Sequence, residues 1–386
     1  MKRSEIQLDY ILLITLCCLF IYSLIAVYSG SGQYQTHDPY YYVKRQVIWY
    51  SIGAIVLVGV ALFDFELLER WALPFYSVGI VLLILVHFFG TFKNGSTRWI
   101  SFGFFDLQPS EFMKVFLILF LSVILKRFAN RALSFKHSIS ITIKVLLLSI
   151  VPFYLILVQP DLGSALVIGA IALSLMLVSG IAYKIVGLVV SSFIALIGFL
   201  VYLHNNFYDI FIKIIKPHQL ERIYGWLSPD EYALSYGYQL KQAVLGIGSG
   251  QMYGSGFNQG IQVQSGKIPE AHTDFIFSVI GEEFGFIGAS ILILLYFILL
   301  YRIMIIGLSS NNVLGYYICA GVIGLISFQV FQNIAMTIGL MPVTGIALPL
   351  FSYGGSALLT NMLALGLVFS VNIRTKKYMF SKSEIM

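Results

Sequence analysis

The sequence predicts an all-α membrane protein in which ten helices cross a bilayer. Hydrophobic residues make up 58% of the 386 residues and charged residues only 11%, whereas soluble domains are about one quarter charged. Apolar segments recur along the chain at close to the length of about 20 residues that a transmembrane helix needs. Length alone is compatible with two or three soluble domains, but the apolar excess favours one helical bundle. We therefore expect a single polytopic membrane domain over residues 1–386.

The apolar segments give ten candidate spans. The first follows Lys2 and Arg3, a pattern that a signal peptide would share. Because this segment is long enough to span and further spans follow, a retained helix is favoured. The turn signal Gln159-Pro160-Asp161 separates the fifth span from the sixth. The spans are predicted at residues 10–28, 46–63, 73–90, 110–126, 143–158, 162–179, 184–203, 274–302, 312–336 and 347–371.

Basic residues give the predicted orientation, because the cytoplasmic loops of membrane proteins are rich in Lys and Arg. Ten spans place every basic cluster on one face, whereas nine or eleven would divide them between faces. We expect this face, with both termini, to be cytoplasmic. Most of the net charge of +6 then reflects topology, and no nucleic-acid partner is predicted. The residues are Lys2, Arg3, Lys126, Arg127, Arg131, Lys136, Lys144, Lys184, Arg302, Arg374, Lys376 and Lys377.

The opposite, extracellular face is then built from five connections, of which 204–273 is the longest. A loop of about 70 residues is unusual unless it is functional. Its first part, Asn205–Leu220, mixes aromatic, aliphatic and basic residues and predicts an amphipathic helix lying on the membrane. The other connections are predicted at 29–45, 91–109, 159–161 and 337–346.

Asp274 opens the predicted eighth span and has two possible roles. Asp and Thr both suit a helix N-cap, and the helix dipole favours an anion there. Alternatively, a carboxylate at the boundary of water and lipid, with apolar neighbours, is desolvated. Its pKa should rise, which suits a general base or acid. The residues around Asp274 leave both interpretations open.

Two further groups lie on the eighth and tenth predicted spans. Glu282 and Glu283 would lie roughly 12–14 Å deeper than Asp274 on one continuous helix. They could form a polar lock between helices or an ion path, and the lock is favoured. The Leu350–Ser356 segment, with Ser352, Gly354, Gly355 and Ser356, predicts either a close approach of helix backbones or a re-entrant wall of a pocket.

Cations on the extracellular face form another candidate site. Arg45, Arg98, Lys114 and Arg222 all fall on the side where positive charge is disfavoured. Each alone could be a solvated or snorkelling residue. Together they favour an anionic ligand, because Arg contacts phosphates in a bidentate manner and Lys as a point charge. Glu111 lies three residues before Lys114, so the two share a helix face. They form either an ion pair that stabilises the helix end or a positioned cation beside a carboxylate at the outer boundary.

Other classes of site have little support. Cys17, Cys18 and Cys319 lie in apolar runs and form neither a disulfide framework nor a zinc motif. The glycines of Gly246–Gly250 do not follow a strand in a βαβ unit, so a dinucleotide site is improbable and no organic cofactor is predicted. Bare carboxylates beside cations indicate sugar or phosphate chemistry rather than acyl transfer.

Several motifs, in order along nearly the whole chain, resemble the shape, elongation, division and sporulation (SEDS) family. Phe331–Met336, running into Gly339–Pro342, looks more like the RodA elongation branch of that family than the FtsW division branch. Ala357 stands where the family usually has a second serine. The matching motifs are Gln108–Lys114, Pro269–Phe277, Gly281–Glu283, Met341–Gly345 and Ser352–Ser356.

This resemblance implies a peptidoglycan glycosyltransferase of the bacterial plasma membrane that polymerises lipid II during cell-wall elongation. It also implies Asp274 as the catalytic carboxylate and a class B penicillin-binding transpeptidase as the partner. The growing strand would be a glycan linked to undecaprenyl pyrophosphate. The lipid tail, the pyrophosphate and the sugar need lipid, cations and an aqueous cavity, and the sequence offers all three.

The expected reaction uses Asp274 to accept the proton of the attacking 4-hydroxyl, which gives a β-1,4 linkage by inversion. Arg45, Arg98, Lys114 and Arg222 would stabilise the leaving pyrophosphate, with Mg²⁺ or Mn²⁺ as a candidate helper, and Glu111 would orient Lys114. Two alternatives belong to other classes: a flippase for lipid-linked precursor, for which Glu282 and Glu283 are the best evidence, and a non-enzymatic scaffold for cell-wall enzymes.

Overall fold

A computed structural model describes residues 9–32, 38–93, 96–101, 103, 106–129, 135–214, 217–232 and 236–375. Some predictions made from basic residues concern positions outside these ranges, at both termini and in the segment 130–134. The basic residues concerned are Lys2, Arg3, Arg131, Lys376 and Lys377.

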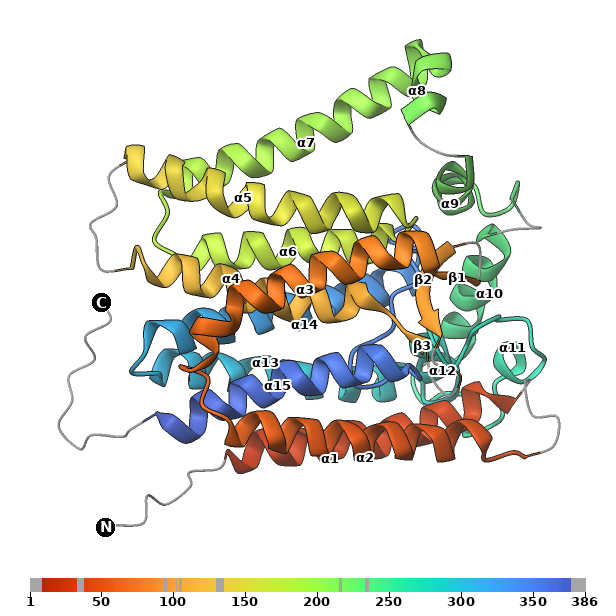
Figure 1. The fold of residues 1–386 in the computed structure, drawn as a ribbon. Helices are drawn as coiled ribbons and strands as arrows, with labels where there is room; N and C mark the ends of the chain where they lie inside the picture. The colour runs from red at the N-terminus through yellow and green to blue at the C-terminus, as the bar shows by residue number, and fades with distance from the viewer. Residues whose placement is uncertain are drawn as a thin grey trace.

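The described residues are mostly helical, and the long helices run side by side in one bundle (Figure 1). The short elements gather at one end, which we call the pocket end: strands β1–β3 and helices α8–α12. The elements are α1 (Tyr10–Gly30), α2 (Tyr41–Leu62), α3 (Leu68–Phe89), β1 (Thr91–Lys93), β2 (Ser96–Ser101), β3 (Asp106–Leu107), α4 (Pro109–Lys126), α5 (Phe135–Val158), α6 (Leu162–Val178), α7 (Tyr183–Asn206), α8 (Tyr208–Ile214), α9 (Pro217–Leu227), α10 (Tyr236–Ser249), α11 (Ile261–Gln264), α12 (Ile276–Glu283), α13 (Gly285–Ser309), α14 (Val313–Thr337) and α15 (Gly355–Arg374).

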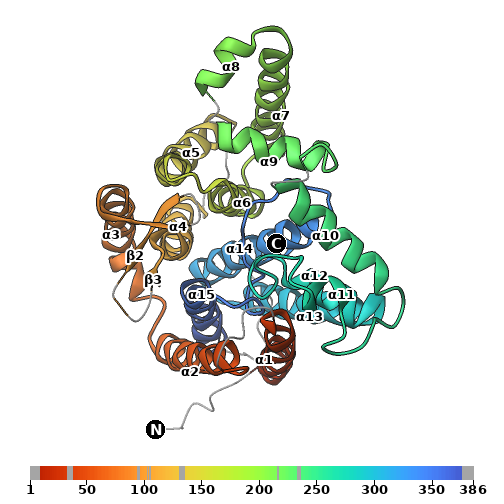
Figure 2. The same cartoon turned by 90° about the vertical axis from the view of Figure 1, so that its right-hand side faces the viewer.

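Eight of the described helices are long and apolar enough to cross a membrane: α1, α2, α3, α5, α7, α13, α14 and α15. The predicted class, a helical protein with several membrane spans, is therefore confirmed. Helix α4 carries Glu111, Lys114 and Lys126 within its 18 residues, and α6 has 17 residues. Seen from the pocket end, α7 lies at the edge of the bundle beside α5 and α6 (Figure 2).

The prediction of one continuous eighth span over 274–302 is wrong, because the helix breaks between α12 and α13. Gly285 has a φ of +63°, and a Cβ on it would lie 2.4 Å from the Gly254 nitrogen. The chain turns there because residues 251 and 252 provide new acceptors. The Phe286 N–H donates to the Gln251 carbonyl (2.8 Å) and the Ile287 N–H to the Met252 carbonyl (3.1 Å). The loop thus caps the first turn of α13.

The last helix also begins later than predicted, at Gly355 rather than residue 347. The chain before it is non-helical although it lies inside the bundle, so its carbonyls need partners other than water. Side chains of α1, α2 and α13 supply them. Ser23 donates to the Phe351 carbonyl (2.7 Å), Tyr296 to that of Pro349 (2.6 Å) and Tyr50 to that of Leu350.

The described part of the long connection 204–273 contains four short helices, α8 to α11, and α10 packs on α12. The predicted amphipathic helix Asn205–Leu220 is instead divided between the end of α7, α8 and the start of α9. Phe211 and Leu220 bury their side chains with Leu203 in a small cluster of their own. The amphipathic segment therefore folds back on itself.

The opposite end of the bundle holds the described basic residues that the charge rule assigns to the cytoplasm. Several form ion pairs that join neighbouring helix ends. Lys126 on α4 pairs with Glu69 on α3 (2.6 Å), and Arg302 on α13 pairs with Asp9 (2.5 Å), the N-cap residue of α1. A further pair links Arg374 on α15 to Asp64 (3.3 Å).

Replacing Gly285 with alanine should destabilise the fold. The positive φ costs a residue with a Cβ about 1–2 kcal/mol, and the contact with the Gly254 nitrogen adds to this. We expect Gly285→Ala to lower the melting temperature of the detergent-solubilised protein. Gly248→Ala is the matched control, because a Cβ there meets nothing within 4 Å. Equal melting temperatures for the two variants would contradict the proposed strain.

Candidate active site

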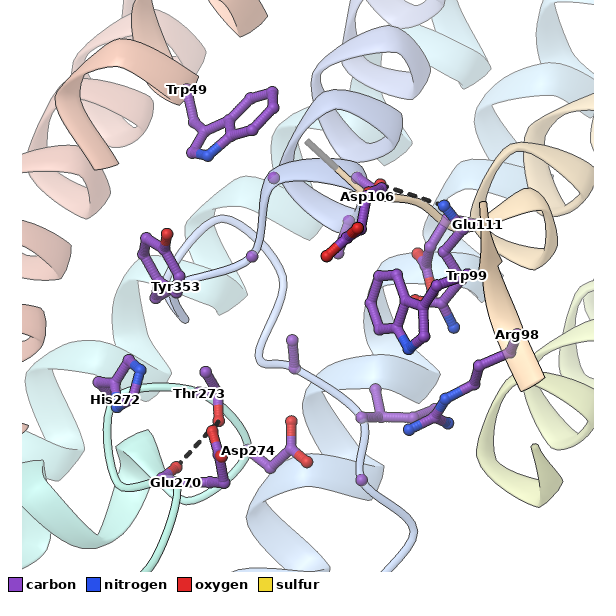
Figure 3. A pocket seen from close by; sticks show the side chains of 18 of the residues that line it. Trp49, Arg98, Trp99, Asp106, Glu111, Glu270, His272, Thr273, Asp274 and Tyr353 are labelled. Carbon is purple, nitrogen blue, oxygen red and sulfur yellow. Dashed lines mark hydrogen bonds between the residues drawn. The ribbon is translucent and has the colours of Figure 1, made fainter. Parts of the chain in front are cut away.

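A cavity of about 550 Å³ opens at the pocket end, between α2, β2, the start of α4 and the turn before α12 (Figure 3). Seven of the residues predicted from the sequence line it: Arg45, Arg98, Glu111, Asp274, Gly354, Gly355 and Ser356. Sequence reasoning missed other lining residues, namely Tyr42, Trp49, Trp99, Asp106, Gln108, Asp161, Ser164, Glu270, His272, Thr273 and Tyr353.

Asp274 lies in the turn that precedes α12, and its side chain points into the cavity (Figure 3). The residues on either side anchor this turn. Phe275 and Ala271 are buried in a small core together with residues of α10 and α11. The prediction of Asp274 as a helix N-cap is wrong, because the N-cap of α12 is Phe275. The Asp274 carboxylate is therefore available to the cavity.

Burial raises the pKa of Asp274 to about 6. The positive charges of Arg98 and, more weakly, Arg222 lower the pKa of Asp274. The negative charges of Glu270 and, more weakly, Asp161 raise it. The desolvation argument made from the sequence thus has a structural basis. A carboxyl group with this pKa is ionised at neutral pH and still basic enough to accept a proton.

Asp161 is the missed carboxylate that pairs with Arg98. It is the N-cap residue of α6, where it accepts the Ser164 N–H (3.1 Å). It also accepts a hydrogen bond from the Gln108 amide (3.1 Å) and pairs with the Arg98 guanidinium (3.4 Å). Burial raises the pKa of Asp161, but Arg98, the Ser164 N–H, the charge of Lys114 and the Ser164 hydroxyl together outweigh burial and hold the pKa below its usual value. Asp161 therefore remains ionised.

Arg98 lies on β2, the central strand of a small antiparallel sheet ordered β1-β2-β3. Its guanidinium acts on two buried carboxylates, those of Asp161 and Asp274. The neighbouring Trp99 also lines the cavity, with its ring centroid 6.0 Å from the Arg98 guanidinium carbon. The sheet thus presents a cation and an aromatic ring together at the cavity wall.

Glu111 and Lys114 form an ion pair of 2.5 Å on α4. Glu111 lines the cavity, whereas the Lys114 side chain is fully buried behind it. Lys114 therefore neutralises a carboxylate of the wall and is not itself a cation of the wall. Arg222, on α9, lies outside the cavity lining but its charge acts on Asp274. The predicted ring of four cations is thus reduced at the wall to Arg45 and Arg98.

Aromatic side chains cover the side of the cavity opposite Arg98. The Tyr42 ring lies 4.5 Å from that of His272 and 5.2 Å from that of Tyr353, measured between centroids, and Trp49 continues the same wall. Burial lowers the pKa of His272 to about 4, so this imidazole is neutral at pH 7. Aromatic faces beside polar groups suit a sugar ring, which has both apolar C–H faces and hydroxyl groups.

The glycine-rich segment before α15 divides between two roles. Ser352 lies behind the cavity, where its hydroxyl accepts the Leu348 N–H (2.8 Å). Gly354, Gly355 and Ser356 line the cavity at the N-terminus of α15. Ser356 donates to the Asp106 carbonyl (2.8 Å) and thereby ties α15 to β3. The segment is therefore a wall of the cavity, as the re-entrant interpretation expects.

Glu282 and Glu283 lie on α12 at the pocket end, not deep in a continuous span. The Glu282 carboxylate accepts the backbone N–H groups of Gln262 (2.7 Å) and Val263 (3.0 Å). Glu283 accepts the Ser29 hydroxyl (2.5 Å) of α1. These contacts are those of a lock that holds the 255–264 loop to α1 and α12, and not those of an ion path.

The divalent cation considered from the sequence has little support in the arrangement of side chains. Within the described ranges, no three residues of His, Cys, Asp or Glu group together as metal ligands. The buried Asp161 carboxylate, a possible metal ligand, already binds the Arg98 guanidinium, the Gln108 amide and the Ser164 N–H. The residues therefore do not fit a metal centre made by protein ligands alone.

Comparisons with known proteins match nearly the whole length of this chain. Residues 9–377 match the model of the cell cycle protein family named for FtsW, RodA and SpoVE. The chain is 33% identical to the probable peptidoglycan glycosyltransferase FtsW of Trichlorobacter lovleyi, over 96% of this chain and 94% of the relative. It is also 33% identical to the peptidoglycan glycosyltransferase MrdB of Escherichia coli K12, over 98% and 97%.

A solved structure described as "structural coordination of polymerization and crosslinking by a peptidoglycan synthase complex" superposes with a TM-score of 0.77. It is 29% identical and covers 94% of this chain and 97% of its own. The resemblance to the SEDS family is confirmed by the family match. Relatives named FtsW and MrdB are equally identical to this chain, so the assignment to the elongation branch stays a prediction.

The carboxyl group of Asp274 should titrate near pH 6. We expect infrared difference spectra to contain a protonated-carboxyl C=O band that disappears as the pH rises through about 6 and is absent from Asp274→Asn. Asp161→Asn is the matched control, and its spectrum should retain that band because the pKa of Asp161 is lowered. A midpoint near 4, the usual range of aspartate, would contradict the desolvation of Asp274.

Proposed function

This chain belongs to the cell cycle protein family of FtsW, RodA and SpoVE, and we propose from this premise that it is a peptidoglycan glycosyltransferase. Its substrate is lipid II, which it polymerises into β-1,4-linked glycan strands. The observation that carries the proposal is the position of Asp274: a carboxylate with a raised pKa faces a cavity that also holds cations and aromatic rings. The names of the full-length relatives support the same activity.

In the proposed reaction, Asp274 accepts the proton of the attacking 4-hydroxyl. The new bond forms between this hydroxyl oxygen and the anomeric carbon of the strand, and the bond from that carbon to the pyrophosphate oxygen breaks. A positioned base contributes a factor of about 10²–10⁴ to such a rate. Attack on the face opposite the pyrophosphate inverts the anomeric centre and gives the β linkage.

The pyrophosphate is best matched by the space between Arg45 and Arg98, which bring positive charge to the cavity from two sides. Arg98 comes from β2, and Arg45 comes from α2, where its charge acts on Tyr353. Preorganised cations stabilise charge that develops on a leaving group without reorganising during the reaction. The N-terminus of α15, at Gly355 and Ser356, adds backbone N–H groups and a favourable dipole to the cavity lining. Tyr42, Trp49 and the other aromatic rings then face the sugars.

Lys114 and Arg222 take supporting roles in this proposal. Because Lys114 is buried against Glu111, its ion pair holds that carboxylate in the wall. Arg222 stabilises the ionised form of Asp274 from α9. The flippase alternative has lost its main evidence, since Glu282 and Glu283 bind the 255–264 loop and α1.

We further propose that α4 and α6 complete a set of ten spans in one membrane domain over residues 1–386. The pocket end is then extracellular, 204–273 is an extracellular loop, and both termini are cytoplasmic in the bacterial plasma membrane. The solved complex that couples polymerisation to crosslinking supports a class B penicillin-binding transpeptidase as partner. An elongation role and a divalent cation, Mg²⁺ or Mn²⁺, carried by the substrate pyrophosphate are parts of the same proposal.

Asp274→Asn should abolish polymerisation of lipid II by the purified protein with its transpeptidase partner. An amide cannot accept the proton, so we expect the rate to fall by at least about 10². The wild-type rate should also fall as the pH drops through about 6, because Asp274 becomes protonated. Asp38→Asn, which alters an exposed aspartate paired with Lys44, should leave the rate unchanged. Normal glycan synthesis by Asp274→Asn would exclude Asp274 as the base.

Arg45 and Lys44 are adjacent cations, but their replacement by alanine should have very different effects on the rate of polymerisation. Arg45 lines the cavity, whereas the Lys44 side chain is 65% exposed and pairs with Asp38. Removing one preorganised charge-stabilising group costs about 10²–10³ in rate, so we expect such a loss for Arg45→Ala and none for Lys44→Ala. Equal polymerisation rates for the two variants would show that Arg45 does not act on the pyrophosphate.

A further inference from the structure

The side chain of Asn333 joins two segments that form the wall beside Asp274. Asn333 lies on α14 and is fully buried. Its amide nitrogen donates one hydrogen bond to the Asp274 carbonyl (2.7 Å) and another to the Ile346 carbonyl (2.7 Å). Both bonds are short, and they use both donors of one amide group. Asn333 itself is absent from the cavity lining.

The second of these segments lies directly against the Asp274 carboxylate. Gly345 has a φ of +73°, and a Cβ on it would lie 3.3 Å from the Asp274 Oδ2 atom. The chain reaches this place by reversing after α14, where the Leu340 N–H and the Met341 N–H both donate to the Ala335 carbonyl. The bonds of Asn333 thus fix the distance between the backbone that carries Asp274 and the backbone that covers it.

We propose that Asn333 is a positioning residue, which acts by holding Asp274 against the Gly345–Ile346 wall. This inference rests on the proposed role of Asp274 as the base. With the clamp in place, the carboxylate keeps its direction toward the cavity and is shielded from water on one side. Without it, the two segments separate, and the carboxylate gains both freedom and hydration.

A role in folding alone makes a different prediction. Loss of the amide leaves the Asp274 and Ile346 carbonyls without these donors, which destabilises the fold, so a lower melting temperature is expected in either case. A purely structural residue would reduce the amount of folded enzyme and leave the chemistry of the remainder unchanged. A positioning residue also changes the rate constant and the pH at which the base titrates.

The direction of the pH effect follows from the surroundings of Asp274. Burial raises its pKa to about 6. The charged groups that act on it are Arg98 on β2, Arg222 on α9, Glu270 in its own turn and Asp161 before α6. None is altered by a change at position 333. Entry of water would therefore lower the pKa of Asp274, and the acid limb of the rate profile would move to lower pH.

The test compares Asn333→Ala with Thr337→Val in the full-length protein bound to its transpeptidase partner. Thr337 is a matched control, because it is fully buried one turn further along α14 and donates only to carbonyls of that helix, those of Asn333 and Ile334. For both variants, the melting temperature and the initial rate of lipid II polymerisation are measured, the rate as a function of substrate concentration and pH. Asn333→Asp is added as a variant of the same shape that lacks the two N–H donors.

For Asn333→Ala we expect kcat to fall about 10²-fold, the size of loss that a misplaced catalytic group produces. KM should change less than about twofold, because Asn333 lies outside the cavity, and the acid limb should move down by about one pH unit, part of the way back to the usual aspartate value. Asn333→Asp should show the same kcat loss. Thr337→Val should keep the wild-type kcat and acid limb per folded molecule.

Two results would overturn the inference. If Asn333→Ala keeps the wild-type kcat and acid limb per folded molecule, as Thr337→Val does, while Asp274→Asn is inactive, then the clamp has no positioning role although the proposed base stands. If Asp274→Asn polymerises lipid II normally, then the proposed base fails and the inference falls with it. The two failures are therefore distinguished by the Asp274→Asn control.

Discussion

Irregular backbone inside an apolar helical bundle must find hydrogen-bond partners within the protein, because lipid offers none. The cavity depends on this constraint, since two of its walls are irregular: the turn at 270–275 and the chain at 338–354. Side chains from surrounding helices meet the need. Tyr50 and Tyr296 serve the carbonyls before α15, and Asn333 serves one carbonyl of each wall. The same bonds that satisfy the backbone therefore set the shape of the site.

Charge balance is the second condition on the site. Arg98 acts on two buried carboxylates at once, and these have opposite pKa shifts: below the usual value for Asp161 and above it for Asp274. Asp161 has a helix N-terminus and the Gln108 amide to satisfy it, whereas burial dominates at Asp274. Two carboxylates a short way apart thus serve different purposes, because one is bound by fixed donors and the other is left to exchange protons.

The sequence singled out Asp274 because a charged group near the end of a span is costly, and Arg45 and Arg98 because positive charge is disfavoured on the extracellular face. The structure places all three at one cavity. The features that sequence reasoning missed have equally physical causes. Hydropathy measures how apolar a segment is and does not show whether its helix is continuous, so it does not predict the helix break at Gly285. Asp161 belongs to the turn Gln159-Pro160-Asp161, and the sequence does not distinguish an aspartate that only caps a helix from one that also lines a cavity. The sequence predicts that Lys114 faces the ligand, but the structure buries it behind Glu111. A spacing of three residues shows that two side chains share a helix face, but it does not show which of them lies nearer the cavity.

A base in a membrane enzyme has to be dry enough to hold a raised pKa and open enough to meet a polar substrate. The same side of a carboxylate cannot both exclude water and admit a polar substrate. The structure divides the two requirements between the sides of Asp274: the Gly345 backbone covers it closely, while the opposite side faces the cavity. The lock made by Glu282 and Glu283 holds the neighbouring 255–264 loop to α1 and α12. Val263 of this loop packs in the same small core as Ala271 and Phe275, so the loop lies beside the turn that carries Asp274.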